Sequence, residues 1–119
     1  MPKRRVGFRI SEPLLVDLKM MMKEEGYRQR QKSQWVSQSI EKLLQQDAKA
    51  MLEKGVFTGD SLNRNSIGVV VSLDEDLLDE VTCKMIELRH QDPLLEDVQS
   101  MLIRASIKSR IEQVKAGQW

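Results

Sequence analysis

The residues with the most distinctive chemistry lie near the N-terminus, at residues 5–10. Arg5, Gly7 and Arg9 alternate there with three apolar residues, and this period of two is typical of a β-strand with one buried face. The outer face would carry two guanidinium groups, whose N–H donors suit anionic and planar acceptors. We therefore predict that this strand offers its outer face to a partner.

A second stretch with the same period lies at residues 67–73. Gly68, Val70 and Ser72 share one face of it, and apolar residues share the other. Two strands in an otherwise helical chain have only each other to pair with, because an unpaired strand leaves backbone N–H and C=O groups unsatisfied. We therefore predict one antiparallel two-stranded ribbon with an apolar inner face.

Charge is distributed unevenly along the chain. The net charge of the 119 residues is +1, but residues 1–46 carry an excess of five positive charges and residues 67–119 an excess of four negative charges. This asymmetry indicates a polyanionic partner for the first half of the chain. The alternative is that the N-terminal half is basic without functional meaning.

Few residues could support catalysis or metal binding. Cys83 and His90 are the only residues of their kinds. A metal site would need more ligands, and a catalytic pair would have to be brought together by the fold. We therefore expect no enzymatic activity, no metal and no cofactor.

The length is that of one small domain or of two very small ones. No apolar run approaches the roughly 20 residues of a bilayer span, and no apolar segment of the secretory type follows the basic N-terminus. The single cysteine excludes an internal disulfide and fits a reducing compartment. We therefore expect a cytoplasmic protein without a membrane partner.

Helical periodicity follows the first predicted strand. Ser11 is expected to cap a helix that ends at Gly26, and Ser33 a second helix whose apolar stripe continues as far as Gly55. Residues 56–66 are rich in glycine, asparagine and serine, so they predict a linker.

The second half repeats this organisation. Asp74 follows the second strand and is expected to cap a third helix. Asp92 and Pro93 are expected to open the last helix, with Glu96 near the reciprocal capping position.

The two halves also match position by position. Residues 10–15 resemble the residues found 63 positions later, and residues 33–44 resemble those found 67 positions later. The four-residue difference falls in the helix–helix connection, where insertions are tolerated. The order β-α-α-β-α-α is therefore predicted, with repeats at 1–55 and 67–119 that together form one domain.

Residues 5–11, Leu14, Leu15 and residues 33–40 carry a resemblance to a known family. A strand with basic residues on its outer face, followed by two helices, resembles the ribbon-helix-helix DNA-binding proteins. With both units in one chain, it looks like the tandem, single-chain TraY-type accessory proteins of conjugative transfer. The resemblance implies a mainly α-helical fold with a pseudo-two-fold axis through one β-ribbon, and a monomer that is an internal pseudo-dimer. Further self-association stays open.

The resemblance also implies that the ribbon enters the major groove of double-stranded DNA, which is wide enough to admit it. Arg5, Gly7 and Arg9 would then face base edges, where arginine can donate two hydrogen bonds to guanine and glycine allows close approach. In the second repeat, Val70 could touch a thymine methyl group and Ser72 could bond to several edges. Readout there would be weaker, so an asymmetric DNA site is expected.

Phosphate contacts are expected mainly from the start of the second helix in each repeat, where free backbone amides favour an anion. The candidates are Lys3, Arg4, Arg28, Arg30, Lys32, Ser33 and Ser100. Lys3 and Arg4 would form an N-terminal arm along the DNA backbone.

Ser100 is the weakest of these candidates. Glu96 and Asp97 precede it and would repel phosphate, and a helix that began at Asp92 would leave Ser100 in its interior. The carboxylates of residues 74–80 are expected to lie away from the duplex.

The expected function is sequence-specific binding of double-stranded DNA, as a transcriptional repressor or as an accessory protein in DNA transfer of a mobile element. The mobile-element role follows only from the resemblance. One alternative is an antitoxin or other protein-interaction module, and another is a helical adaptor that has lost DNA binding. Arg5 and Arg9 would then be exposed strand charges that prevent aggregation.

Overall fold

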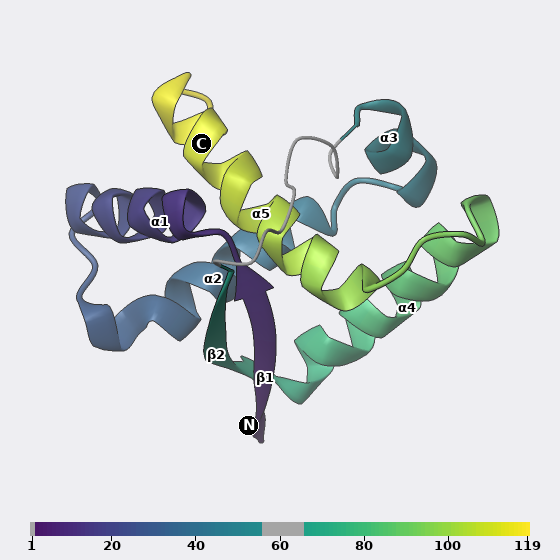
Figure 1. Ribbon diagram of the computed structural model, residues 1–119, viewed down its shortest axis with the longest axis horizontal. Coiled ribbons are helices and arrows are strands. Elements are labelled where there is room, and N and C mark those ends of the chain that lie inside the picture. Colours follow the sequence, from purple (N-terminus) through teal and green to yellow (C-terminus); the bar gives the residue numbers. More distant parts are fainter. Residues whose placement is uncertain (1, 56–65) are drawn as a thin grey trace.

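The computed structural model describes residues 2–55 and 66–119 and is mainly α-helical with one two-stranded antiparallel sheet (Figure 1). Its elements are strand β1 (Lys3–Ile10), helix α1 (Glu12–Glu24), the short 3-10 helix η1 (Gln29–Gln31), helices α2 (Lys32–Leu43) and α3 (Ala48–Glu53), strand β2 (Ile67–Asp74), and helices α4 (Glu75–Gln91) and α5 (Val98–Lys115). Of the predicted linker, only Ser66 lies within the described residues. No helix in these two ranges combines the length and the apolar character that a bilayer crossing requires.

The two strands come from opposite halves of the chain and pair with each other along their whole length. The antiparallel register runs from Lys3 opposite Asp74 to Ile10 opposite Ile67. The predicted ribbon is therefore confirmed, and β1 begins two residues earlier than expected. A lone two-stranded ribbon is only marginally stable in water, so one of its faces must pack against something apolar.

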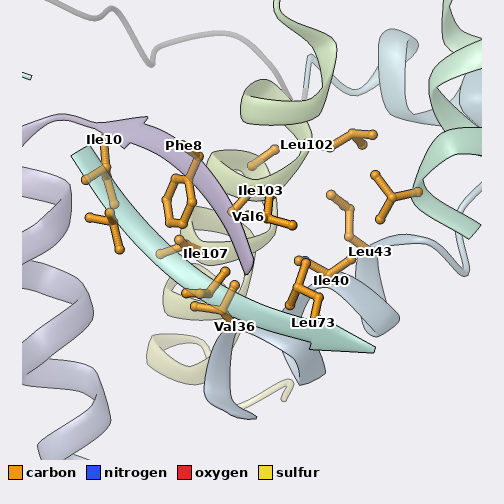
Figure 2. Close-up of a cluster of buried hydrophobic side chains, with 14 of the residues drawn as sticks. Val6, Phe8, Ile10, Val36, Ile40, Leu43, Leu73, Leu102, Ile103 and Ile107 are labelled. Carbon is orange, nitrogen blue, oxygen red and sulfur yellow. The ribbon is translucent and has the colours of Figure 1, made fainter. Parts of the chain in front are cut away.

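Alternation decides which side chains of the ribbon are buried. The inward-facing apolar residues are at most 7% exposed: Val6, Phe8, Ile10, Val69, Val71 and Leu73. Figure 2 shows this face turned toward Val36 and Ile40 of α2 and toward Ile103 and Ile107 of α5. Each large apolar side chain buried here contributes about 1.5–3 kcal/mol, and this burial attaches the ribbon to the helices.

Helices α2 and α5 pack against each other under the ribbon, while α1 and α4 extend to opposite sides of it (Figure 1). Trp35 of α2 is fully buried, as its place on the apolar stripe predicts. Ser39 and Ser106, related by the offset of 67, are each 1% exposed. Their Oγ atoms donate hydrogen bonds to Trp35 O at 2.8 Å and to Ile103 O at 2.6 Å. Both hydroxyls are therefore satisfied within their own helices.

Helix α2 is shorter than its apolar stripe predicts. It ends at Leu43, and the separate helix α3 carries the rest of the stripe. Asp47 has extended backbone angles, and its Oδ1 accepts a hydrogen bond from the Ala50 N–H at 2.7 Å. The prediction of one long helix is wrong, because this local cap favours a new helix start over continuation of α2. The observed order therefore contains α3, which the β-α-α-β-α-α pattern lacks.

Helix α5 begins later than Asp92, where the sequence predicts its start. Asp92 Oδ1 accepts a hydrogen bond from the Leu94 N–H at 3.2 Å and so stabilises a turn in place of a helix cap. Asp97, with a left-handed φ of 53°, directly precedes the first helical residue, Val98. Aspartate tolerates this conformation better than most residues, so the turn ends and the helix begins at this point.

A buried ion pair ties α5 to the α1–α2 connection. Arg110 Nη2 lies 3.1 Å from Glu25 Oε2, and the two side chains are 2% and 17% exposed. Glu25 also accepts a hydrogen bond from Trp35 Nε1, and Arg110 Nη1 donates to Trp35 O at 2.9 Å. The guanidinium carbon is 4.3 Å from the ring centre of Trp35 and 4.5 Å from that of Trp119. The C-terminal tryptophan, for which the sequence suggests no role, therefore stacks on the guanidinium of Arg110.

Replacing Glu25 by glutamine is expected to lower the free energy of unfolding by about 1–3 kcal/mol, because a buried guanidinium loses its charged acceptor. Glu24→Gln, at the exposed neighbouring position, is the matched control and should change stability by less than about 0.5 kcal/mol. Urea denaturation followed by circular dichroism measures both. Equal stability of the two variants would contradict a structural role for the pair.

Candidate nucleic-acid interface

The outer face of the ribbon brings together all five residues that the sequence predicts as base contacts. Arg5 lies opposite Ser72, Gly7 opposite Val70, and Arg9 opposite Gly68 in the antiparallel register. All of these positions are exposed except Ser72, which is partly buried. Their common placement agrees with the strand periodicity, while their role as base contacts stays a prediction.

The two strands contribute different chemistry to this face. Both arginines come from β1, and the residues directly opposite them on β2 are Ser72 and Gly68. Lys3 shares the outward parity of Arg5 and Arg9 and extends the cationic row to the start of β1. The face is therefore basic along β1, while β2 contributes Gly68, the exposed Val70 and Ser72, with Asp74 opposite Lys3 at its end.

Lys3 and Arg4 belong to β1, so the prediction of a separate N-terminal arm is wrong. Strand pairing extends to this end of the ribbon because the Glu75 N–H donates to Pro2 O at 3.2 Å just beyond Lys3 and Asp74. Arg4 has the inward parity, but it lies beyond the core and remains exposed. Asp74 is the last residue of β2, so this one carboxylate lies at the ribbon, while the other acidic residues up to position 80 lie on α4.

The two arginines differ in how they are held. Arg9 Nε donates to Ser66 Oγ at 2.8 Å, and Arg9 Nη2 donates to Ser66 O. The backbone carbonyl of Arg9 accepts a hydrogen bond from Arg104 Nη1 at 3.1 Å. Within the described residues, the guanidinium of Arg5 has neither an ion pair nor a hydrogen bond. Arg9 is therefore oriented before any partner arrives, and Arg5 is not.

Neither outward-facing glycine is required by the packing of the fold. A Cβ atom built at Gly7 or Gly68 would meet no atom within 4 Å, and neither residue has a positive φ. Glycine inside a strand is unfavourable for stability. The bare backbone at these positions therefore suits close approach of something outside the protein.

Helix α2 begins beside the outer edge of β2. The Oγ of Ser33, the second residue of α2, accepts a hydrogen bond from the Ser72 N–H at 2.9 Å. No side chain caps the N-terminus of α2, and Arg28 and Arg30 are exposed just before it. Ser33 therefore joins this helix start to the ribbon. The 3-10 helix η1 leads directly into α2, and the first amide of α2, the Lys32 N–H, donates to Gln29 O of η1.

Helix α5 begins beside β1. Ser100 is the third residue of α5, because the helix begins at Val98 and not at Asp92. It therefore lies near the helix start and not in the interior, while its contact with phosphate stays a prediction. Arg104 links this helix start to Arg9 and lies 3.9 Å from Asp97 Oδ2, so the carboxylate before Ser100 has a cation beside it.

Cys83 and His90 both lie exposed on α4. Among the described residues, no group of three or more His, Cys, Asp or Glu side chains could hold a metal ion.

Four residues with contacts described above have no role that the sequence predicts. They are Ser66, which was assigned to the linker, and Glu25, Arg104 and Arg110. The two arginines could have been found in the sequence as charged residues at helix positions that are otherwise apolar. Nothing in the sequence identifies their partners.

The link between Ser33 and β2 can be tested without any ligand. Ser33→Ala is expected to speed amide hydrogen exchange at Ser72 by about 2- to 10-fold, because one hydrogen bond is lost. Ser37→Ala, one turn further along α2, is the matched control and should leave Ser72 unchanged. Exchange followed by NMR measures both, and equal rates at Ser72 in the two variants would contradict the contact.

Comparison of the chain with protein-family models, with curated proteins and with solved structures found no match. The feature of the described residues that points to a function is therefore the outer face of the ribbon, with a helix start beside each strand.

Proposed function

We propose that this protein binds double-stranded DNA by laying the outer face of the β1–β2 ribbon into the major groove. The observation that carries the proposal is an exposed ribbon face with Arg5 and Arg9 on one strand and no competing carboxylate among the residues opposite them. A two-stranded ribbon fits the width of the major groove. Arginine in that position can form two hydrogen bonds with guanine O6 and N7.

The proposal includes a tandem ribbon-helix-helix organisation with α3 as an addition between the two units. Units β1-α1-α2 and β2-α4-α5 would be related by a pseudo-two-fold axis through the ribbon. The antiparallel pairing of β1 with β2 and the packing of α2 on α5 support this relation. The equivalent buried serines, Ser39 and Ser106, support it as well.

The starts of α2 and α5 would contact the DNA backbone on either side of the groove. Backbone amides at a helix N-terminus attract phosphate, and such contacts fix the register of a protein on the duplex. Arg28, Arg30 and Lys32 lie next to the start of α2 and would strengthen this side. Glu96 and Asp97 precede α5, so its contact would be weaker. The preferred DNA site would therefore be asymmetric, as for a repressor or a DNA-transfer accessory protein.

A protein-interaction module is the second candidate function. A surface hollow of about 700 Å³ lies between the end of α2 and helix α4, and Leu44 and Leu77 are among the residues that line it. Carboxylates, including Asp76, Asp79 and Glu80, surround it. A basic segment of a partner protein, such as the protein that an antitoxin binds, would fit this acidic lining. The bare glycines of the ribbon favour DNA binding over the alternative that Arg5 and Arg9 are only charges that prevent aggregation. Charges with that role would not need a ribbon face that something can approach closely.

Binding to a randomised pool of duplexes, with selection and sequencing, tests the proposal. Affinity should fall steeply with salt, because phosphate contacts release counterions. Arg5→Ala or Arg9→Ala is expected to cost about 1–3 kcal/mol of discrimination at one base pair. Lys32→Ala should weaken all sequences alike and reduce the salt slope by about 1.

Arg89→Ala removes an exposed positive charge near the end of α4 and serves as the charge control, with little change expected. Loss of affinity that is equal on every sequence for Arg5→Ala, Arg9→Ala and Lys32→Ala would contradict base reading by the strand. Binding of a basic peptide with no binding of any duplex would favour the protein-interaction module.

Gly7→Val tests the close approach of the ribbon. Folding stability should be unchanged or higher, because a β-branched residue suits a strand and the structure has room for a side chain there. Affinity for the selected duplex should fall about tenfold or more, as expected when a contact worth about 1–3 kcal/mol is pushed away. Thermal unfolding and fluorescence anisotropy measure the two effects. Full affinity in a stable Gly7→Val protein would exclude backbone approach at this position.

A further inference from the structure

We propose that Ser66, the residue directly before β2, is a positioning residue that orients Arg9 for base recognition. The inference rests on the proposed function and deepens it, because it assigns a determinant of specificity outside the strand that would touch DNA. Ser66 itself need not contact the duplex. Its action would pass through the guanidinium of Arg9.

The contact uses one edge of the guanidinium and leaves another open. Ser66 accepts two hydrogen bonds, from Arg9 Nε to its Oγ at 2.8 Å and from Arg9 Nη2 to its backbone carbonyl. A guanidinium has five N–H donors in one plane, so both hydrogens of Nη1 and one of Nη2 remain available. These hydrogens lie at the end of the side chain and match the O6 and N7 acceptors of guanine.

The position of Arg9 is determined from its backbone as well. Its carbonyl accepts a hydrogen bond at 3.1 Å from Nη1 of Arg104, whose side chain is only 6% exposed. The residue opposite Arg9 is Gly68, so no side chain on β2 stands at that point of the ribbon. Arg9 can therefore extend over the ribbon to Ser66, held by α5 at one end and by Ser66 at the other.

Prior orientation has a consequence for binding. Immobilising a long, flexible side chain costs conformational entropy when a complex forms, and a side chain already held in place avoids part of that cost. A guanidinium that is held in one orientation also cannot adjust its hydrogen bonds to a base other than the one it fits. The base pair read by Arg9 should therefore be discriminated more strictly than the pair read by Arg5, which has no such contact within the described residues.

The experiment has a DNA-free arm and a DNA arm. In the free protein, NMR should show slower exchange of the Arg9 Nε–H than of the Arg5 Nε–H, and Ser66→Ala should remove the difference. On DNA, selection from the randomised pool identifies the base pair whose preference disappears in Arg9→Ala. Ser66→Ala should reduce discrimination at that pair by about 2- to 10-fold, the effect of a single hydrogen bond.

Three comparisons separate positioning from a general structural effect. Ser66→Ala should leave the base pair assigned to Arg5 unchanged. It should add nothing when combined with Arg9→Ala. Ser109→Ala is the matched control and should leave every preference intact. It removes a hydroxyl on α5 whose one recorded partner, within residues 2–55 and 66–119, is Gln113 in the same helix.

Each other outcome overturns the inference in a recognisable way. If Arg9→Ala abolishes a base preference while Ser66→Ala leaves it unchanged or sharper, Ser66 does not position Arg9, although the proposed function stands. If Ser66→Ala weakens every base pair equally, or adds to Arg9→Ala, its role is structural. If the protein binds no duplex or shows no preference, the proposed function fails and the inference fails with it.

Discussion

The fold depends on one constraint: each strand can satisfy its backbone only by pairing with the strand from the other half of the chain. β1 and β2 lie more than fifty residues apart in sequence, yet they pair in register along eight residues each. This pairing brings the two halves together. It also requires that one ribbon face be buried, because a two-stranded ribbon alone is marginal in water.

The rest of the architecture follows from that buried face. Helices α2 and α5 cover it and pack on each other, so their N-terminal ends lie beside the edges of the ribbon. The opposite face is left without a covering element among the described residues, and it carries the arginines. The core and the candidate interface are therefore two sides of the same eight-residue strands, and alternation assigns each side chain to one of them.

Polar contacts then connect the core to the exposed face. Arg104 is nearly buried, yet it reaches the backbone of Arg9 on the ribbon. Arg110, paired with Glu25 and enclosed by Trp35 and Trp119, joins α5 to the first half of the chain. A buried charge that keeps a close partner is costly to disturb, so these contacts hold α5 in one position relative to the ribbon. The geometry of the arginine face depends in turn on that position.

The sequence alone was enough to predict the ribbon, its antiparallel pairing and the sorting of its faces, because a period of two assigns side chains to opposite sides whatever the rest of the chain does. It also predicted the buried place of Trp35 from helical spacing. It did not predict the break at Asp47 or the start of α5 at Val98, because an apolar stripe reports which residues face the core and not where a local side-chain hydrogen bond ends a helix. The Arg9–Ser66 contact and the Arg110–Glu25 pair join residues that are 57 and 85 positions apart. Only the tertiary structure decides such contacts, since they form after the ribbon and helices have been packed together.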